Sequence, residues 1–303
     1  MGRRKHGANI HGIVLLDKPV GISSNRAVQR VRGIFQARKA GHTGSLDPFA
    51  TGMLPICLGE ASKTAAFMLE AGKCYRATAL LGVATSTGDV EGEVIQTCPV
   101  ADIGSEGLVR ILQQFVGDIK QVPPMYSALK HEGKPLYEYA RAGIDIKRSS
   151  RSVTIHDLEL VDWQSPRLTF DVHCSKGTYI RTLAEDIARA LGSCAHLVEL
   201  RRTVVEPFGD FPMVTLATLQ EAKDSGGGLS AMLLPIDVGL ASWPRVDLDS
   251  VKRDKFRHGQ QLQVPDGGSD TGKVRVYGPD GDVLGLAEIT PGGELKPSRV
   301  FNL

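Results

Sequence analysis

The chain has few cysteines, and their spacing gives them no structural role. There are five among 303 residues, an odd number, and no Cys-x-x-Cys pair occurs. Scattered cysteines without an export signal are typical of free thiols in a reducing compartment. We therefore expect no disulfide and a cytoplasmic protein. The five are Cys57, Cys74, Cys98, Cys174 and Cys194.

Long apolar runs are also absent. No stretch approaches the roughly 18 consecutive apolar residues that a membrane-spanning helix needs. The basic residues 1–6 are not followed by the apolar segment of a signal peptide. We expect neither membrane insertion nor secretion.

Several common catalytic patterns are missing as well. Residues 59–64 end in Lys-Thr like a phosphate loop but lack the glycine directly before the lysine, and no Gly-x-Ser-x-Gly occurs. His173 and Cys174, with Cys194 and His196, are zinc-ligand types, but adjacent strand residues point to opposite faces. The zinc pattern His-x-Glu with Cys-x-x-Cys is also absent. We expect no NTPase, no hydrolase, no metal-dependent nuclease or deaminase, and no bound metal.

The charge is small overall but uneven along the chain. The formal net charge is +2, yet residues 1–41 carry nine Lys/Arg and one acid, which leaves −6 for the other 262 residues. A basic region on an otherwise acidic protein favours an anionic polymer as partner, because phosphate neutralisation supplies most non-specific affinity. A solvated helix face next to a tail would show the same charge. Charge alone leaves both interpretations open.

The apolar patterns predict an α+β protein with a mixed, largely antiparallel sheet and flanking helices. Several neighbouring strands lack a helix between them, which argues against a doubly wound sheet. We predict strands at 12–16, 53–58, 75–81 paired with 93–96, 152–161, 167–174 and 197–205. A helix should follow an N-cap at Ser23-Ser24, with apolar residues at helical spacing from Ala27 to Phe35, and further helices are predicted at 60–69, 105–115 and 179–191.

A second, small domain is expected at the C-terminal end. A boundary is predicted near Trp243-Pro244, so that residues 1–243 form the first domain and 244–303 the second. In the second domain short apolar runs are separated by Gly-Pro-Asp-Gly-Asp and Pro-Gly-Gly-Glu turns. This pattern is typical of an all-β domain.

A segment of about residues 120–151 mixes basic and aromatic side chains. Its lysines and arginines alternate with Tyr126, Tyr137 and Tyr139. Such mixing suits nucleic acid, since cations meet phosphates and rings stack on bases.

Asp47 is the most informative single residue. It precedes Pro48 in the glycine-rich stretch of residues 40–52, which we expect to be a shaped loop rather than a regular element. An aspartate beside a proline usually accepts hydrogen bonds within its own turn. Here the loop also holds His42 and follows a basic helix, so an anionic polymer would be delivered to the carboxylate.

Four segments resemble the TruB family of tRNA pseudouridine synthases, in order and in spacing over about residues 10–205. They are Leu-Asp-Lys-Pro-Val-Gly at 16–21, Ala-Gly-His-Thr-Gly-Ser-Leu-Asp-Pro at 40–48, Met-Tyr-Ser-Ala-Leu-Lys at 125–130 and Cys-Ser-Lys-Gly-Thr-Tyr-Ile-Arg at 174–181. The resemblance implies an RNA-gripping insertion near 120–151 and a PUA-like C-terminal domain. It also implies an isomerase that converts a uridine in the T-arm of tRNA, position 55, to pseudouridine without a cofactor.

The same resemblance gives roles to single residues. Asp47 would be the covalent nucleophile, attacking either the ribose or the base. Arg181 would pair with Asp47 and hold it ionised, since a nearby cation favours the charged form. Tyr75 would stack on the uracil and could take part in proton transfer. Arg181 as a surface charge and Tyr75 as ordinary packing are the alternatives.

Five further residues are expected to bind the substrate. His42 would fill the space left when the target nucleotide is extruded, because its reactive atoms are inaccessible in a stacked arm. Tyr179 and Leu200 would complete the pocket, although Leu200 also fits a plain core position. Lys18 and Lys130 are placed near RNA phosphate or in the loop structure.

The expected partner is tRNA, with no obligate protein partner and a monomer as the default. An RNA-binding chaperone that helps tRNA to fold is the main alternative. Base flipping would itself loosen the T-arm, so one protein could have both activities.

Overall fold

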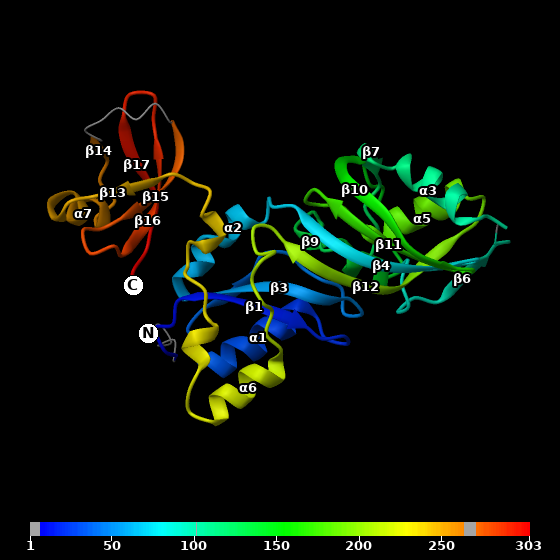
Figure 1. Cartoon of the computed structure of the whole chain (residues 1–303), viewed down its shortest axis with the longest axis horizontal. Coiled ribbons are helices and arrows are strands. Elements are labelled where there is room, and N and C mark those ends of the chain that lie inside the picture. Colours follow the sequence, from blue (N-terminus) through cyan, green and yellow to red (C-terminus); the bar gives the residue numbers. More distant parts are fainter. Residues whose placement is uncertain (1–6, 101, 264–270) are drawn as a thin grey trace.

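The computed structural model describes residues 7–100, 102–263 and 271–303, and its largest element is an eight-stranded sheet (Figure 1). The strand order is β1-β3-β12-β4-β11-β10-β7, with β2 paired to β3. Only β12 and β3 run parallel; the other pairs are antiparallel, as predicted. The strands are β1 (Gly12–Lys18), β2 (Ala40–His42), β3 (Thr51–Leu58), β4 (Lys73–Leu81), β7 (Gly117–Gln121), β10 (Arg151–Gln164), β11 (Arg167–Cys174) and β12 (Ala195–Val205).

Four helices cover parts of this sheet. They are α1 (Ser24–Phe35), α3 (Ser105–Gln113), α5 (Ile180–Ala190) and α6 (Leu216–Asp224). Helix α1 begins where the sequence predicts, because the Ser23 side chain accepts the Arg26 N–H at 3.2 Å. Its buried stripe includes Val28 and Val31, which join the main core with apolar residues of α3 and α5. The arginines of α1 lie on its other, exposed side.

Three local predictions are wrong. The helix predicted at 60–69 is two short pieces, η1 (Gly59–Lys63) and α2 (Ala65–Met68), with Thr64 between them donating its hydroxyl to the Ala61 carbonyl at 2.8 Å. The strand β6 (Val94–Thr97) pairs with β5 (Val83–Thr85) rather than with β4, because β11 and β12 occupy both edges of β4. The loop at 40–52 begins with the short strand β2 and ends with the start of β3.

The C-terminal end forms its own five-stranded sheet, in the order β13-β15-β16-β17-β14. A helix that the sequence pattern did not reveal, α7 (Ser250–Arg257), is capped by Asp249 and buries Phe256 against this sheet. The strands are β13 (Arg245–Asp247), β14 (Leu262–Gln263), β15 (Gly272–Tyr277), β16 (Val283–Ile289) and β17 (Glu294–Val300).

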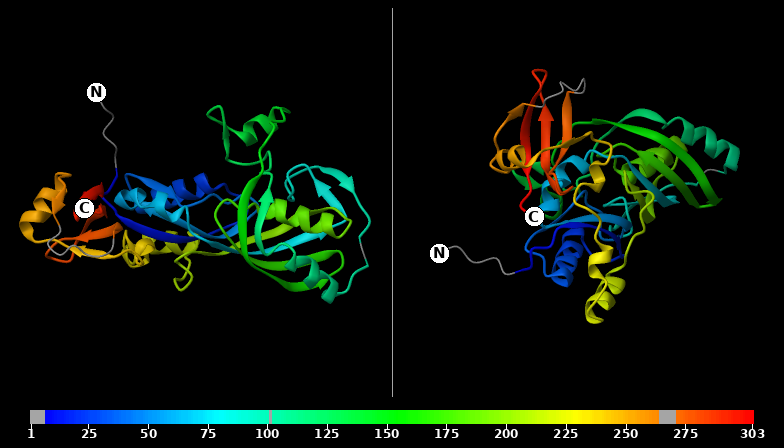
Figure 2. Two further views of the ribbon diagram at one scale, coloured as in Figure 1. Left: turned by 90° about the horizontal axis from the view of Figure 1, so that it is seen from above. Right: turned by 60° about the vertical axis from the view of Figure 1, so that its left-hand side comes forward.

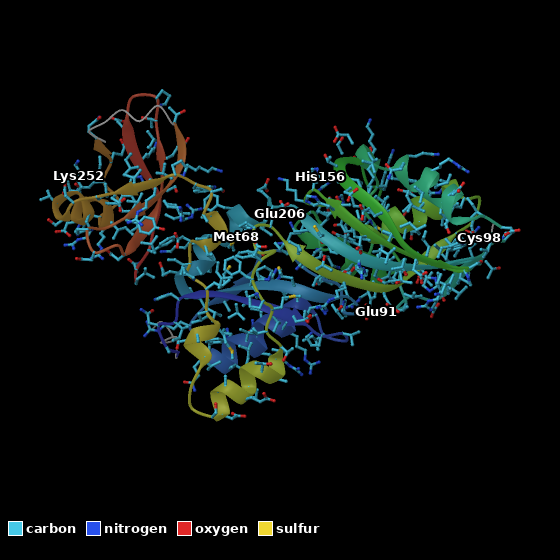
Figure 3. The ribbon with its side chains drawn as sticks, in the orientation of Figure 1. Met68, Glu91, Cys98, His156, Glu206 and Lys252 are labelled. Atoms are coloured by element: carbon cyan, nitrogen blue, oxygen red, sulfur yellow. A yellow bond between two sulfur atoms is a disulfide. The ribbon has the colours of Figure 1, made fainter. Side chains whose placement is uncertain are left out.

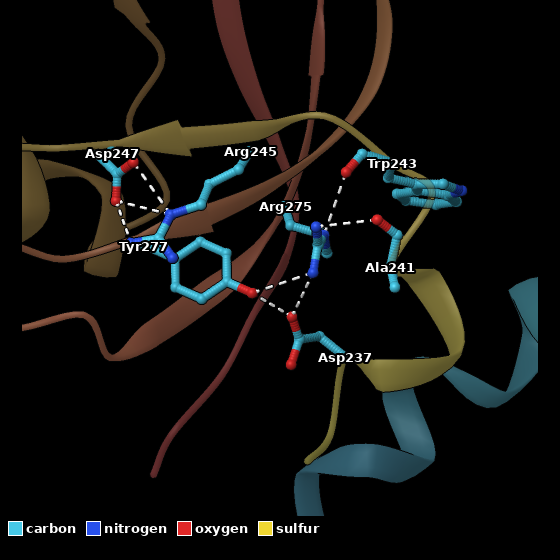
Figure 4. A network of polar contacts seen from close by, with 7 residues as sticks. All are labelled: Asp237, Ala241, Trp243, Arg245, Asp247, Arg275 and Tyr277. Atoms are coloured by element: carbon cyan, nitrogen blue, oxygen red, sulfur yellow. Dashed lines mark hydrogen bonds and ion pairs between the residues drawn. The ribbon is translucent and has the colours of Figure 1, made fainter. Parts of the chain in front are cut away.

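A polar network and an apolar cluster attach this sheet to the rest of the chain. Arg275 on β15 pairs with Asp237 at 3.1 Å and donates to the Ala241 and Trp243 carbonyls (Figure 4). The Tyr277 hydroxyl also donates to Asp237. The strap of residues 237–243 is therefore fixed to β15. Beside it lies an apolar cluster of Met68, Phe208, Leu240, Leu286 and Phe301 with their neighbours.

The prediction that all cysteines are free thiols is wrong. Cys98, after β6, and Cys194, before β12, form a disulfide with their Cα atoms 5.8 Å apart. Both lie beside Gly82, whose N–H donates to the Cys194 carbonyl and whose carbonyl accepts the Cys98 N–H. Spacing alone could not show this pair, because a fold brings together residues separated by 96 positions. Figure 3 shows Cys98 at the end of the molecule remote from the C-terminal sheet.

Within the ranges that the structure describes, no helix combines the length and the apolar character needed to cross a membrane.

Candidate active site

The loop that carries Asp47 joins β2 to β3 and is held by hydrogen bonds from outside it. The hydroxyl of Ser24 accepts the Leu46 N–H at 2.7 Å and donates to the Leu46 carbonyl at 2.9 Å. The Gly21 N–H donates to the Pro48 carbonyl at 2.8 Å. Asp47 takes part in its own turn only through its backbone carbonyl, which accepts the Ala50 N–H. Its carboxylate can therefore interact with groups outside this turn.

The structure brings Arg181 and Asp47 together. Nε of Arg181 lies 3.1 Å from a carboxylate oxygen of Asp47. The guanidinium also donates to the carbonyls of Thr87 and Tyr126, at 2.7 Å each, so its orientation is fixed independently of Asp47. Burial raises the pKa of Asp47 above its ordinary value, and the charge of Arg181 opposes that rise. The pKa of Asp47 therefore stays raised, but by less than burial alone would raise it.

Asp89 is a site residue that the sequence did not reveal. Its buried carboxylate lies 3.4 Å from Nη1 of Arg181. It also accepts the Thr87 hydroxyl at 2.6 Å and the Glu91 N–H at 3.0 Å. Its sequence signal is only that of a turn, Ser-Thr-Gly-Asp at 86–89, between the strands predicted at 75–81 and 93–96. A buried acid is stable there because the arginine and two further donors satisfy it.

Lys18 belongs to the loop structure rather than to a phosphate contact. Its side chain is fully buried, and its ammonium donates to the carbonyls of Pro19, Ile22 and Pro48 at 2.9, 2.8 and 3.2 Å. Burial lowers its pKa to about 8. Of the two placements expected for this lysine, the structure therefore supports the one in the loop structure, next to Pro48.

Tyr75 and Leu200 lie on neighbouring strands, β4 and β12, and both side chains are buried. Burial raises the pKa of the Tyr75 hydroxyl, while the nearby Arg202 guanidinium opposes this. Arg202 was not predicted as a site residue. It lies directly opposite Tyr75 in the β4–β12 register.

His42 and Tyr179 lie at the edges of the site. Nδ1 of His42 accepts the Gly44 N–H at 3.2 Å, and burial lowers the pKa of the ring, which is therefore neutral at pH 7. Tyr179 caps α5, two residues before Arg181, and exchanges two hydrogen bonds with the Gln121 amide. Burial raises the pKa of its hydroxyl.

Lys130 lies apart from the other predicted residues. It is exposed on the small hairpin of β8 (Lys130–His131) and β9 (Lys134–Pro135), which leads into α4 (Leu136–Arg141). This green segment projects from the body of the molecule in the left view of Figure 2. Lys134 lies 4.9 Å from the Tyr139 ring centre, and Arg141 5.5 Å from that of Tyr137. The projection therefore presents cations on aromatic faces.

The chain matches family models along most of its length. Residues 32–180 match the TruB family pseudouridylate synthase N-terminal domain. Residues 181–241 match the tRNA pseudouridylate synthase B C-terminal domain, and residues 244–301 the pseudouridine synthase II TruB C-terminal domain. Asp47 lies in the first match and Arg181 opens the second. These matches define the class of the protein: it is a pseudouridine synthase, an isomerase.

Relatives extend the match to the whole chain. A tRNA pseudouridine synthase B from Nitrosococcus oceani is 51% identical over 99% of this chain and 97% of its own length. One from Actinobacillus pleuropneumoniae is 46% identical over 99% of each. A chain in the crystal structure of a Cbf5-Nop10-Gar1 complex superposes with a TM-score of 0.74 at 27% identity, covering 96% of this chain and 85% of that one. The protein belongs to the TruB family.

Proposed function

We propose that this protein isomerises one uridine in the T-arm of tRNA, position 55, to pseudouridine, with Asp47 as covalent nucleophile. The observation that carries the proposal is the 3.1 Å pair of Asp47 with a buried, independently anchored Arg181. The relatives at 46–51% identity named tRNA pseudouridine synthase B support tRNA as the substrate.

The proposed reaction needs only the carboxylate and the substrate. Asp47 attacks the ribose or the base, and the N-glycosidic bond of the uridine breaks. The detached uracil turns and is joined to the same ribose carbon through its C5 carbon, the bond to Asp47 breaks and restores the carboxylate, the C5 proton leaves and N1 gains a proton. Atoms and electrons balance within the nucleotide, so the step is an isomerisation without a co-reactant.

The surrounding residues support a flipped nucleotide. Unstacking makes the glycosidic bond accessible to the loop. Tyr75 stacks on the uracil beside Leu200, and Tyr179 closes the pocket next to Arg181. The neutral ring of His42 occupies the place of the extruded base. These roles are consistent with the edge positions of His42 and Tyr179.

Two basic regions would deliver the RNA. Helix α1 leads into the catalytic loop and exposes Arg26 and Arg30. The insertion at 120–151 projects with its lysine and arginine on tyrosine rings. We assign catalysis to residues 1–243 and an accessory RNA contact to a PUA-like domain at 244–303. A cytoplasmic monomer suffices for this arrangement.

The test uses unmodified tRNA transcript without added cofactor. Wild type should form pseudouridine at the T-loop uridine, whereas Asp47→Asn should form none. Asp210→Asn, which alters an exposed aspartate, should behave like wild type. Product at another uridine would refute the assigned position, and full activity of Asp47→Asn would refute the nucleophile.

A tRNA-folding chaperone role is the second candidate. The projecting, cation-bearing insertion favours it, because such a segment can grip RNA without chemistry. Asp47→Asn separates the two roles. If the variant still speeds recovery of native tRNA structure after mild heating, the chaperone role stands independently of catalysis.

A further inference from the structure

Arg202 is among the largest side chains buried completely in the described part of the molecule. Its guanidinium makes three hydrogen bonds to backbone carbonyls. Nε donates to Met53 at 2.7 Å, Nη2 to Gly44 at 3.0 Å and Nη1 to Ser45 at 3.3 Å. The bonds therefore reach both ends of the loop that holds Asp47. Burying a charged group is costly unless its donors are hydrogen-bonded, and here the three carbonyls accept from the Arg202 guanidinium.

The backbone of Arg202 occupies an equally central place. On β12 it pairs with Tyr75 of β4 on one side and with Gly52 of β3 on the other. A Cβ atom at Gly52 would lie 2.2 Å from the Arg202 carbonyl oxygen, so the strands approach as closely as only glycine allows. One residue thus joins the strand of Tyr75 to the strand that follows Asp47.

We propose that Arg202 is a positioning residue for the isomerisation: its guanidinium fixes the turn at residues 44–47 relative to Tyr75. The inference rests on the proposed roles of Asp47 and Tyr75. The nucleophile and the stacking ring must meet the same nucleotide, but Asp47 lies in the loop before β3 and Tyr75 lies on β4. Misplacement by about 1 Å can cost about 100-fold in rate. Arg202 supplies the fixed connection between them.

Arg201 offers a matched control on the same strand. It is the neighbouring residue and carries the same side chain, but it points to the opposite face of the sheet. There it forms a partly exposed pair with Asp17 at 2.8 Å. Its loss removes one arginine from β12 without touching the loop carbonyls.

The experiment compares Arg202→Met, Arg202→Lys and Arg201→Met with wild type. Single-turnover pseudouridine formation is followed with enzyme in excess, over a range of enzyme concentrations, and rates are corrected for the folded fraction. Arg202→Met should lower the saturating rate about 100-fold with an unchanged half-saturating concentration. Arg202→Lys, which keeps the charge but cannot reach all three carbonyls, should recover part of the rate. Arg201→Met should match wild type.

A second readout does not depend on activity. Hydrogen–deuterium exchange should speed up in the peptide covering residues 43–53 of Arg202→Met and stay unchanged in β16. A wild-type rate per folded molecule, a loss confined to half-saturation, or unchanged exchange at 43–53 would each overturn the proposal. If wild type formed no pseudouridine at all, the proposed function would fail instead. Exchange would then still report whether Arg202 holds the turn.

Discussion

Arg181 is almost enclosed, with 5% of its side chain exposed, whereas its partner Asp47 is 38% exposed. The cation is thus enclosed by the protein, whereas the side chain of Asp47 is only partly buried. Two carbonyls and Asp89 fix the guanidinium before any substrate arrives. Such preorganisation avoids reorientation during the reaction.

Arg181→Met should lower the rate of pseudouridine formation by about 10²–10³-fold, the usual loss for one preorganised electrostatic partner. It should also move the acid limb of the pH–rate profile to higher pH. Burial raises the pKa of Asp47 and Arg181 opposes that rise, so without the arginine the reactive carboxylate is lost at a higher pH as the solution is acidified. Single-turnover rates across pH measure both effects.

The control for this prediction is Arg189→Met on the same helix, where Arg189 is exposed and pairs with Asp186. It should keep the wild-type profile. An acid limb unchanged by Arg181→Met would show that another group controls it.

The two lysines with predicted substrate contacts should differ in their salt dependence. Lys18 is buried on carbonyls, so Lys18→Met should lower the rate and leave the slope of log affinity for tRNA against log salt unchanged. Lys130 is exposed on the projecting hairpin, so Lys130→Met should reduce that slope by about one, the effect of one lost phosphate contact. Filter binding over a salt series distinguishes them. A reduced slope for Lys18→Met would return Lys18 to the RNA interface.

Gly52→Ala should abolish most activity. It should also destabilise the fold by more than roughly 1–2 kcal/mol, which is the cost of a non-glycine residue in a left-handed backbone conformation. Its φ is +99°, and the added Cβ would meet the Arg202 carbonyl at 2.2 Å. Gly21→Ala is the matched control. The φ of Gly21 is also positive, at +81°, but beyond its chain neighbours a Cβ added there would have no atom within 4 Å. Thermal unfolding of both variants separates backbone strain from the steric clash. Equal losses would mean that the close approach of the strands has no effect of its own.

The strands of the sheet could be predicted because the alternation of buried and exposed side chains appears in the local sequence as alternating apolar and polar residues. Asp47 could be singled out as a candidate for a similar reason, because its glycine-rich loop and the neighbouring basic helix are both local features. No local pattern indicates Asp89 or Arg202, because their contacts join segments that lie far apart in the sequence. Nothing in Arg201-Arg202 shows which arginine is buried, since the register of β12 against β3 and β4 decides it.

The disulfide could not be predicted for the same reason, since its cysteines are 96 positions apart. It can be tested by measuring the free energy of unfolding. Cys98→Ser in the oxidised protein should lower the free energy of unfolding by about 2–4 kcal/mol, because the bond closes a long loop of the unfolded chain. Cys74→Ser, which alters a half-buried free thiol, should change it by less than about 1 kcal/mol. Denaturant unfolding with and without reductant provides the measurement. Wild-type stability that does not respond to reductant would contradict the bond.

The attachment of the strap of residues 237–243 to β15 should depend more on Asp237 than on any exposed ion pair of the C-terminal sheet. Asp237 and Arg275 are both largely buried, and Tyr277 shares the same carboxylate. Asp237→Ala leaves the arginine charge without a partner, which should cost about 3 kcal/mol. Asp247→Ala removes an exposed pair with Arg245 and should cost about 0–1 kcal/mol. Thermal unfolding and protease cleavage within 237–243 measure the difference. Equal losses would show that the apolar cluster with Phe208 and Phe301 attaches the sheet without help from the carboxylate.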